Sequence, residues 1–352
     1  VFARPVLELL QTPPEILDAA HSYIIIIFWG IGAAMLFNLL SNVIRALGDS
    51  RTPLYFLVLA CVLNIALDLA LILRFGMGPA GAAVATVVSQ LVSGLLCTIY
   101  VFRKFPMLRL TRADWNMSRR YLWAHIRLAL PMGFQASIIA IGAILVQFGL
   151  NRLGGQAVAA FSAAQKIDMV ATLPMMSFGI AMATYVAQNY GARNPLRIRQ
   201  GVLQCSLMSV GFSIAVAVVN IIWGPELIRL FVGTGEREVV RLAQIYLNIN
   251  ASMYWVLALL FVFRYTLQGL GQSVVPTFAG VMELAMRAFA AIILARYLGF
   301  AGASMASPAA WIGSCVPLAI AYFFTRKRLA QSTKQPFPPC SGEERESIRQ
   351  AA

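Results

Sequence analysis

Asp68 is the most unusual side chain of the sequence, because it stands inside an apolar run that extends from about residue 53 to residue 73. A charged side chain at the centre of a bilayer costs about 2.5–3.5 kcal/mol, so such a residue is a candidate for function. Asn64 precedes Asp68 by one helical turn and shares its helix face. Thr86 lies at a similar expected depth in the next apolar run.

These three side chains offer a carboxylate, an amide carbonyl and a hydroxyl, which are hard oxygen ligands suited to Na⁺. The carboxylate could instead bind H⁺. We therefore predict a cation site at Asn64, Asp68 and Thr86. In the alternative interpretation, Asp68 reaches the membrane surface or pairs with Arg74, and the other two side chains only bridge helices.

Polar groups also interrupt the apolar runs of the second half. Glu283 and Arg287 are four residues apart, which predicts an ion pair with either a structural role or a role in substrate contact or lobe coupling. Gln135 could face a cavity or bridge two helices. Lys166 and Asp168 are expected to pair at a membrane boundary. The Cys and His residues have no metal-ligand or redox spacing, so no cofactor is predicted beyond Na⁺ or H⁺ as coupling ion.

The amino-acid composition indicates whether water or lipid surrounds these groups. Charged residues make up 12% of the chain and apolar residues 59%, and the mean hydropathy is +0.74. A soluble domain carries about a quarter charged residues. The apolar runs are continuous and do not alternate with a period of two, which favours membrane-spanning helices over a barrel. We predict an all-α integral membrane protein, a polytopic bundle in the cell (inner) membrane.

Nine complete spans are expected, and residues 1–11 resemble the end of a tenth. The predicted spans are residues 22–44, 53–73, 79–102, 128–150, 168–190, 202–223, 245–268, 274–295 and 302–324. Lys and Arg concentrate in alternate loops, which places those loops in the cytoplasm. The net charge of +14 thus reflects orientation, and no nucleic-acid partner is expected.

Two halves of the sequence repeat each other. The stretch from Arg45 to Pro53 matches that from Gln268 to Pro276, with Gly48 and Gly271 separated by 223 positions. The stretch from Gly78 to Ala82 resembles that from Gly299 to Ala303, at a separation of 221. The later copy holds six spans, an even number, so the two copies are expected to be parallel repeats that form two six-helix lobes.

The repeat predicts a domain organisation. Residues 1–102 would be the remainder of an N-terminal lobe, residues 103–127 a basic cytoplasmic linker, residues 128–324 the C-terminal lobe, and residues 325–352 a polar cytoplasmic tail. The chain begins with Val1 and the first lobe lacks spans, so it is expected to be an N-terminally truncated piece of a twelve-span protein.

Three motifs carry a resemblance to a known family. They are Arg45-Ala46-Leu47-Gly48-Asp49-Ser50, the stretch from Gln188 to Pro195, and Leu267-Gln268-Gly269-Leu270-Gly271. With these motifs the chain resembles the multidrug and toxic compound extrusion (MATE) family, and within it the bacterial DNA-damage-inducible branch. The resemblance implies two lobes around a cavity that opens alternately to each side, and export of organic compounds in exchange for Na⁺ or H⁺.

The resemblance also implies residue roles. An Asn and an Asp one turn apart, with a Thr on the next helix, form the cation site of the N-terminal lobe in that branch, and Asn64, Asp68 and Thr86 match them. The family site includes an Asp from the first helix, which has no counterpart in this chain. The expected function is therefore a monomeric antiporter, not an enzyme, whose substrates are organic and cationic or amphipathic and which has membrane lipid around it.

Other function classes have less support. A lipid-linked precursor flippase of the same superfamily would line its cavity with several arginines, and only Arg287 and Arg264 qualify. A membrane enzyme would need clustered acids or a His–acid site within the spans. A channel is disfavoured because tandem six-helix lobes with one buried cation site indicate alternating access.

Overall fold

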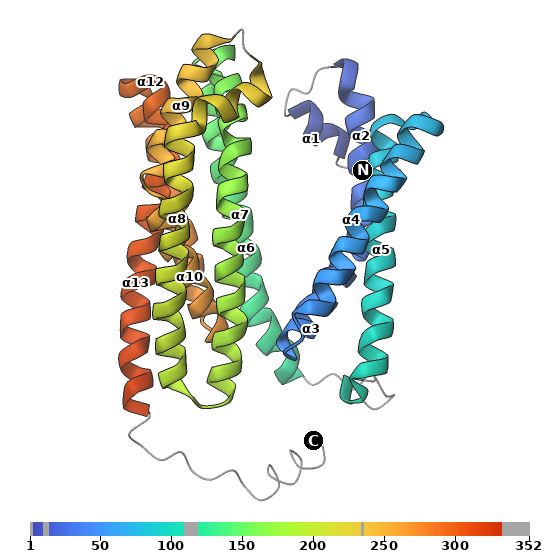
Figure 1. Ribbon diagram of the computed structural model, residues 1–352, viewed down its shortest axis with the longest axis vertical. Helices are drawn as coiled ribbons and strands as arrows, with labels where there is room; N and C mark the ends of the chain where they lie inside the picture. The colour runs from blue at the N-terminus through green and yellow to red at the C-terminus, as the bar shows by residue number, and fades with distance from the viewer. Residues whose placement is uncertain (1–2, 10–13, 109–118, 234–235, 333–352) are drawn as a thin grey trace, which may run out of the picture. The chain divides into compact units, whose positions relative to one another are not determined.

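The computed structural model describes residues 3–9, 14–108, 119–233 and 236–332, and every regular element in these ranges is a helix (Figure 1). Parts of three predicted segments lie outside the described residues, namely the start of the chain, the middle of the linker and most of the tail. The chain divides into two compact units, the first ending at residue 116 and the second covering residues 117–339.

The first unit consists of long helices that pack around α5. The helix α5 contacts α2, α3 and α4, and its small buried core includes Phe37, Ile44, Cys97 and Val101. The elements are α1 (Ala3–Leu9), α2 (Pro14–Trp29), α3 (Ile31–Ala46), α4 (Arg51–Leu69), the π-helical η1 (Ala70–Arg74), α5 (Gly78–Lys104) and the short 3₁₀ turn η2 (Pro106–Leu108).

The second unit has a larger core, in which α7 and α10 pack against each other and against α8. Tyr246 and Tyr254 are among its fully buried side chains. In Figure 1 the helices α6, α7, α8, α10 and α13 of this unit run alongside one another. The elements are α6 (Arg119–Asn151), α7 (Gly155–Gly191), α8 (Pro195–Val232), α9 (Arg237–Ala251), α10 (Tyr254–Gly269), α11 (Val274–Phe289), the π-helical η4 (Ala290–Leu294), α12 (Ala295–Ser304) and α13 (Ala306–Ser332).

The helices are long and apolar enough to cross a membrane. Among the described residues seven single helices qualify, and two bent pairs raise the number to nine if each pair is one span. The predicted spans 22–44 and 245–268 correspond to these two pairs, so each of these two spans is bent. The helices α2 and α3 meet at 47°, and α9 and α10 at 50°. Gly30 stands at the first bend, but neither Gly nor Pro marks the second.

Two predicted boundaries differ from those of the structure. The helix α6 begins at Arg119, inside the predicted linker 103–127, and α13 continues to Ser332, inside the predicted tail 325–352. Hydropathy ends a span where Lys and Arg begin, whereas Lys and Arg are good helix formers and let the helix continue into water. The apolar run is therefore shorter than the helix that carries it.

Backbone features recur between the two units at the spacing of the sequence repeat. Gly48 and Gly271 adopt positive φ values of 93° and 77°, and Gly78 and Gly299 adopt values of 56° and 57°. The π-helical segments η1 and η4 begin 220 positions apart, at Ala70 and Ala290. Because residues with a side chain rarely adopt such φ values, the shared backbone turns explain why glycine is repeated at these positions.

Asp49 of the first motif fixes the start of α4 to the end of α5. Its carboxylate accepts hydrogen bonds from the Tyr100 hydroxyl (2.6 Å), the Thr52 hydroxyl (2.7 Å) and the Thr52 backbone N–H (3.1 Å). Lys104 Nζ lies 3.6 Å away. The hydrogen bond from Tyr100, followed by those from Thr52, holds the pKa of Asp49 well below its usual range. The motif residue Asp49 is thus a structural clamp.

Replacing Gly302 by Ala is expected to lower the free energy of unfolding by about 1–3 kcal/mol, the usual range for overpacking. A Cβ at Gly302 would lie 2.1 Å from the Leu294 carbonyl oxygen, a backbone atom that cannot rotate away. Thermal unfolding in detergent measures the effect. The control is Gly133→Ala on α6, where no atom lies within 4 Å of the added Cβ. Equal stability of the two variants would contradict the close approach.

Candidate functional site

Asn64 and Thr86 come together between α4 and α5. The distance from Asn64 Nδ2 to Thr86 Oγ1 is 3.5 Å, a weak contact. The Thr86 hydroxyl donates to the Ala82 carbonyl at 2.9 Å, so its oxygen keeps free acceptor capacity. Both side chains are half-buried. The structure thus brings together two of the three residues of the predicted cation site.

Asp68 lies one turn after Asn64 on the same face of α4. The residue is half-buried, and its Oδ1 atom is shielded from solvent without any hydrogen-bond partner. Within the described ranges no ion pair joins Asp68 to Arg74, whose side chain is exposed at the end of η1. Buried polar atoms are nearly always hydrogen-bonded, so an unsatisfied carboxylate oxygen needs an explanation. An acid of this kind can accept a cation or a proton.

The π-helical turn η1 begins two residues after Asp68. Such turns occur often at functional sites. The second unit has the equivalent turn, η4, at the end of α11, and the residues there, Ala-Ala-Ile-Ile-Leu, are all apolar. The π turn is therefore a property of the repeated fold, and among the described residues only the first unit combines it with a preceding acid that has no ion pair.

The described residues do not form the kind of cluster that binds a transition metal. No three His, Cys, Asp or Glu side chains gather as they would around a transition metal anywhere in the part of the chain that the structure describes. One carboxylate with neutral oxygens suits a monovalent hard cation or a proton.

A closed ion network occupies the second unit. Glu283 Oε1 lies 3.0 Å from Arg287 Nη2, as the spacing of four residues predicts, and Glu283 Oε2 lies 2.8 Å from Arg264 Nη2 on α10. Arg264 also donates to Ser314 Oγ on α13 at 3.0 Å. The side chains of Glu283 and Arg264 are 6% and 8% exposed. Both carboxylate oxygens of Glu283 are engaged, and the network as a whole joins α10, α11 and α13.

Sequence reasoning missed most of this network. Arg264 stands in an apolar run, and that position was a signal for an interhelical partner. Gly142 of α6 leaves room for the stem of Arg287, because a Cβ there would lie 2.8 Å from Arg287 Cδ. Ser314 carries no comparable signal in the sequence.

Asp168 forms a second polar chain in this unit. Its Oδ1 accepts a hydrogen bond from the Tyr254 hydroxyl at 2.6 Å, and Asn220 Nδ2 donates to that hydroxyl at 3.1 Å. The Lys166 ammonium lies 5.6 Å from the centroid of the Phe231 ring. The expected Lys166–Asp168 pair is therefore wrong, since residues two apart on a helix face different directions.

Gln135 links two helices of the second unit. Its Oε1 accepts a hydrogen bond from Gln268 Nε2 at 3.2 Å, and the residue is 4% exposed. Its own Nε2 is buried without a partner. Of the two roles considered from the sequence, the structure places Gln135 as a bridge between α6 and α10.

Long apolar helices with buried charged groups define a multi-pass membrane protein. The MatE family model matches residues 1–70 and 131–293, a range that includes Asn64, Asp68, Gln135, Glu283 and Arg287 but not Thr86. The chain belongs to the MatE family.

Individual proteins resemble the chain over most of its length. It is 33% identical to "Probable multidrug resistance protein YpnP" of Bacillus subtilis (strain 168), over 75% of this chain and 59% of that protein. It is 26% identical to "Probable multidrug resistance protein YoeA" of the same organism, over 93% of this chain and 73% of that protein. The chain thus spans 59% and 73% of the lengths of these relatives.

A solved structure has the same fold. The outward-facing conformation of a multidrug resistance MATE family transporter of the MOP superfamily superimposes with a TM-score of 0.84. The match covers 94% of this chain and 74% of the other, at 22% sequence identity. The all-α polytopic bundle predicted from the sequence is confirmed.

Proposed function

We propose that the full-length protein is a secondary active antiporter, which exports organic compounds of cationic or amphipathic character in exchange for Na⁺ or H⁺. The observation that carries this proposal is Asp68, an acid on an apolar helix whose Oδ1 is shielded and has no hydrogen-bond partner. Family membership and the names of the relatives support the export of small organic compounds.

In this proposal Asp68 holds the coupling ion, and the oxygens of Asn64 and Thr86 complete its shell. A bound cation would offset the cost of keeping the carboxylate away from water, so occupancy would favour one shape of the surrounding helices. The segments 1–102 and 128–324 act as the two lobes of an alternating-access cycle, connected by the linker 103–127 and followed by the tail 325–352.

The flippase alternative has less support. The two arginines within spans that would attract an anionic lipid-linked substrate, Arg264 and Arg287, are both bound to Glu283. The carboxylate of Glu283 thus engages both guanidinium groups and balances one of their two positive charges.

The proposal is tested with the full-length protein in proteoliposomes loaded with a fluorescent organic cation. We expect saturable efflux that accelerates when an inward gradient of Na⁺ or of H⁺ is imposed, because exchange couples the two flows. Transport that saturates but ignores both gradients would contradict antiport. A flux that does not saturate would indicate a channel.

A further inference from the structure

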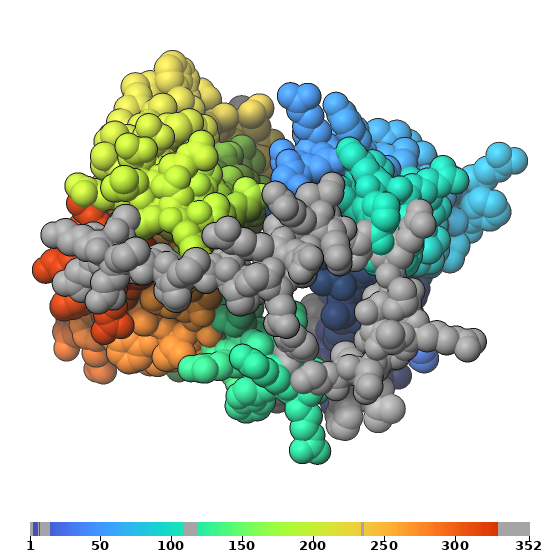
Figure 2. All heavy atoms as spheres, turned by 90° about the horizontal axis from the view of Figure 1, so that it is seen from below, coloured from blue at the N-terminus to red at the C-terminus, as the bar shows by residue number. Residues whose placement is uncertain are grey.

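A basic pocket at one end of the second unit is not used by the proposed transport cycle. It has a volume of about 850 Å³ and lies between the start of α6, the α10–α11 turn and the end of α13. Figure 2 looks at this end of the molecule, where the first residues of α6 and the orange atoms around the α10–α11 turn lie side by side. A hydrogen bond from Ser273 Oγ to the Arg127 carbonyl oxygen (3.2 Å) connects the two segments.

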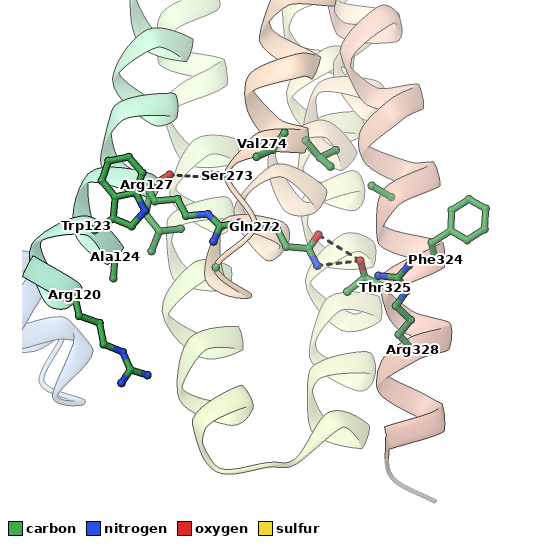
Figure 3. Close-up of a pocket in the computed structure, with 14 residues that line it drawn as sticks. Arg120, Trp123, Ala124, Arg127, Gln272, Ser273, Val274, Phe324, Thr325 and Arg328 are labelled. Carbon is green, nitrogen blue, oxygen red and sulfur yellow. Dashed lines mark hydrogen bonds between the residues drawn. The ribbon is translucent and has the colours of Figure 1, made fainter. Parts of the chain in front are cut away.

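Positive charge dominates the polar part of the basic pocket. Three of its fourteen described lining residues are arginines, Arg120, Arg127 and Arg328, and none of the fourteen is acidic. In Figure 3 the side chain of Arg127 extends toward Gln272, and that of Arg328 lies beside Thr325. No ion pair connects Arg127 or Arg328 to an acid of the described residues. Two guanidinium groups without an acidic partner among the described residues therefore line one cavity.

The neutral lining adds hydrogen-bonding groups. Gln272 and Thr325 bind each other across the basic pocket, at 3.3 Å from Gln272 Nε2 to Thr325 Oγ1. A guanidinium with nearby amide and hydroxyl donors suits the oxygens of a phosphate group.

The remaining walls are apolar and continue onto the outer surface of the helices. Val274 and Phe324 are 69% and 63% exposed, and both lie at the ends of apolar spans. Trp123 lines the basic pocket on the α6 side (Figure 3). Tryptophan is enriched at the level of lipid headgroups. A ligand of this pocket is thus expected to carry a phosphate and to extend an apolar part toward the surrounding lipid.

The sequence places this end of the bundle on the cytoplasmic side, because it carries the basic residues that flank the spans. Anionic phospholipids give the cytoplasmic leaflet its negative surface potential, and basic pockets between helices on this side bind lipid headgroups. We propose that the basic pocket binds the headgroup of an anionic phospholipid, with its phosphate between Arg127 and Arg328.

Trp123 allows a direct test with the full-length protein in lipid bilayers. Bilayers of phosphatidylcholine receive a minor fraction of phosphatidylglycerol, and the bromine atoms are placed on the acyl chains of one lipid or the other. The fluorescence of Trp123 is the difference between the protein and its Trp123→Phe variant. We expect brominated phosphatidylglycerol to quench this component far more than its mole fraction predicts.

The arginines are tested by a pair of double variants. Arg127→Gln with Arg328→Gln is expected to reduce the preference for phosphatidylglycerol about thirtyfold, because each lost charge near the surface contributes a factor of about five. Arg127→Lys with Arg328→Lys keeps the charge and is expected to retain most of the preference. The control is Arg296→Gln, an exposed arginine of α12 that does not line the pocket.

Two results would overturn the proposal. Quenching of Trp123 in proportion to mole fraction would mean that the basic pocket does not select an anionic lipid. A preference that sodium phosphate at millimolar concentration abolishes would mean that the ligand is a free phosphate compound. Because transport is not measured, failure here is distinguishable from failure of the antiport proposal.

Discussion

Replacing Glu283 by Gln is expected to lower the free energy of unfolding by about 3–5 kcal/mol, the usual effect of removing one partner from a buried ion pair. The variant keeps the size of the side chain but leaves Arg264 and Arg287 without the carboxylate that lies 2.8 Å and 3.0 Å from them. Both arginines are buried or nearly so, and water cannot replace the lost charge. Unfolding by heat or by a denaturing detergent measures the loss.

The matched control is Glu238→Gln on α9. Glu238 binds Arg241 at 2.6 Å, but both side chains are largely exposed, so little change is expected. A second variant separates charge from packing: replacing Glu283 by Leu together with Arg264 and Arg287 by Met is expected to restore most of the stability. The interpretation fails if Glu283→Gln is no more destabilising than Glu238→Gln.

Replacing Asp68 by Asn is expected to reduce cation-driven efflux of the full-length protein about thirtyfold or more. Removal of a buried charge from a binding partner costs about 2 kcal/mol or more, which corresponds to that factor in affinity. If H⁺ is the coupling ion, the residual efflux should be independent of pH, because the amide cannot take up a proton. If Na⁺ is the coupling ion, the dependence on Na⁺ should disappear.

Protein stability distinguishes a functional Asp68 from a structural one. Its Oδ1 has no partner to lose, so Asp68→Asn is expected to leave the unfolding temperature unchanged or to raise it. Asp18→Asn on α2 serves as the control, since Asp18 is 88% exposed. Normal coupled efflux by the Asp68→Asn variant would disprove the role of Asp68.

Replacing Thr86 by Val should weaken the cation dependence of efflux by about tenfold, because the hydroxyl ligand is lost. Thr98→Val is the matched control and should not weaken it, although both hydroxyls donate to the carbonyl four residues earlier.

The fold was largely predictable because each span is a long apolar run whose period excludes strands. The sequence repeat could also be recognised at Gly48 and Gly271, since a positive φ value favours glycine at both positions. The bend between α9 and α10 was not predictable: it falls at Ser252 and Met253, and neither residue breaks a helix strongly. The start of α6 was missed because Arg119 is charged but still favours helix.

Some contacts of the candidate sites were likewise predictable from the sequence, and others were not. Contacts within one helix follow from spacing, as for Glu283 and Arg287. Contacts between helices depend on packing that one sequence does not specify. The contacts of Arg264 with Glu283 and of Tyr254 with Asp168 were therefore identified only in the structure. The Asn64–Thr86 contact was predictable because a short turn joins antiparallel neighbours.

The duplicated fold has the same backbone turns in both units but distributes electrical charge unequally between them. In the second unit both carboxylate oxygens of Glu283 contact guanidinium groups, those of Arg264 and Arg287, so this acid has partners of opposite charge. In the first unit Asp68 stands without such a partner in the described residues. In the proposed antiport, a bound ion would thus change the electrostatic energy of the first unit, where Asp68 would gain a partner, and not that of Glu283, which already has its partners.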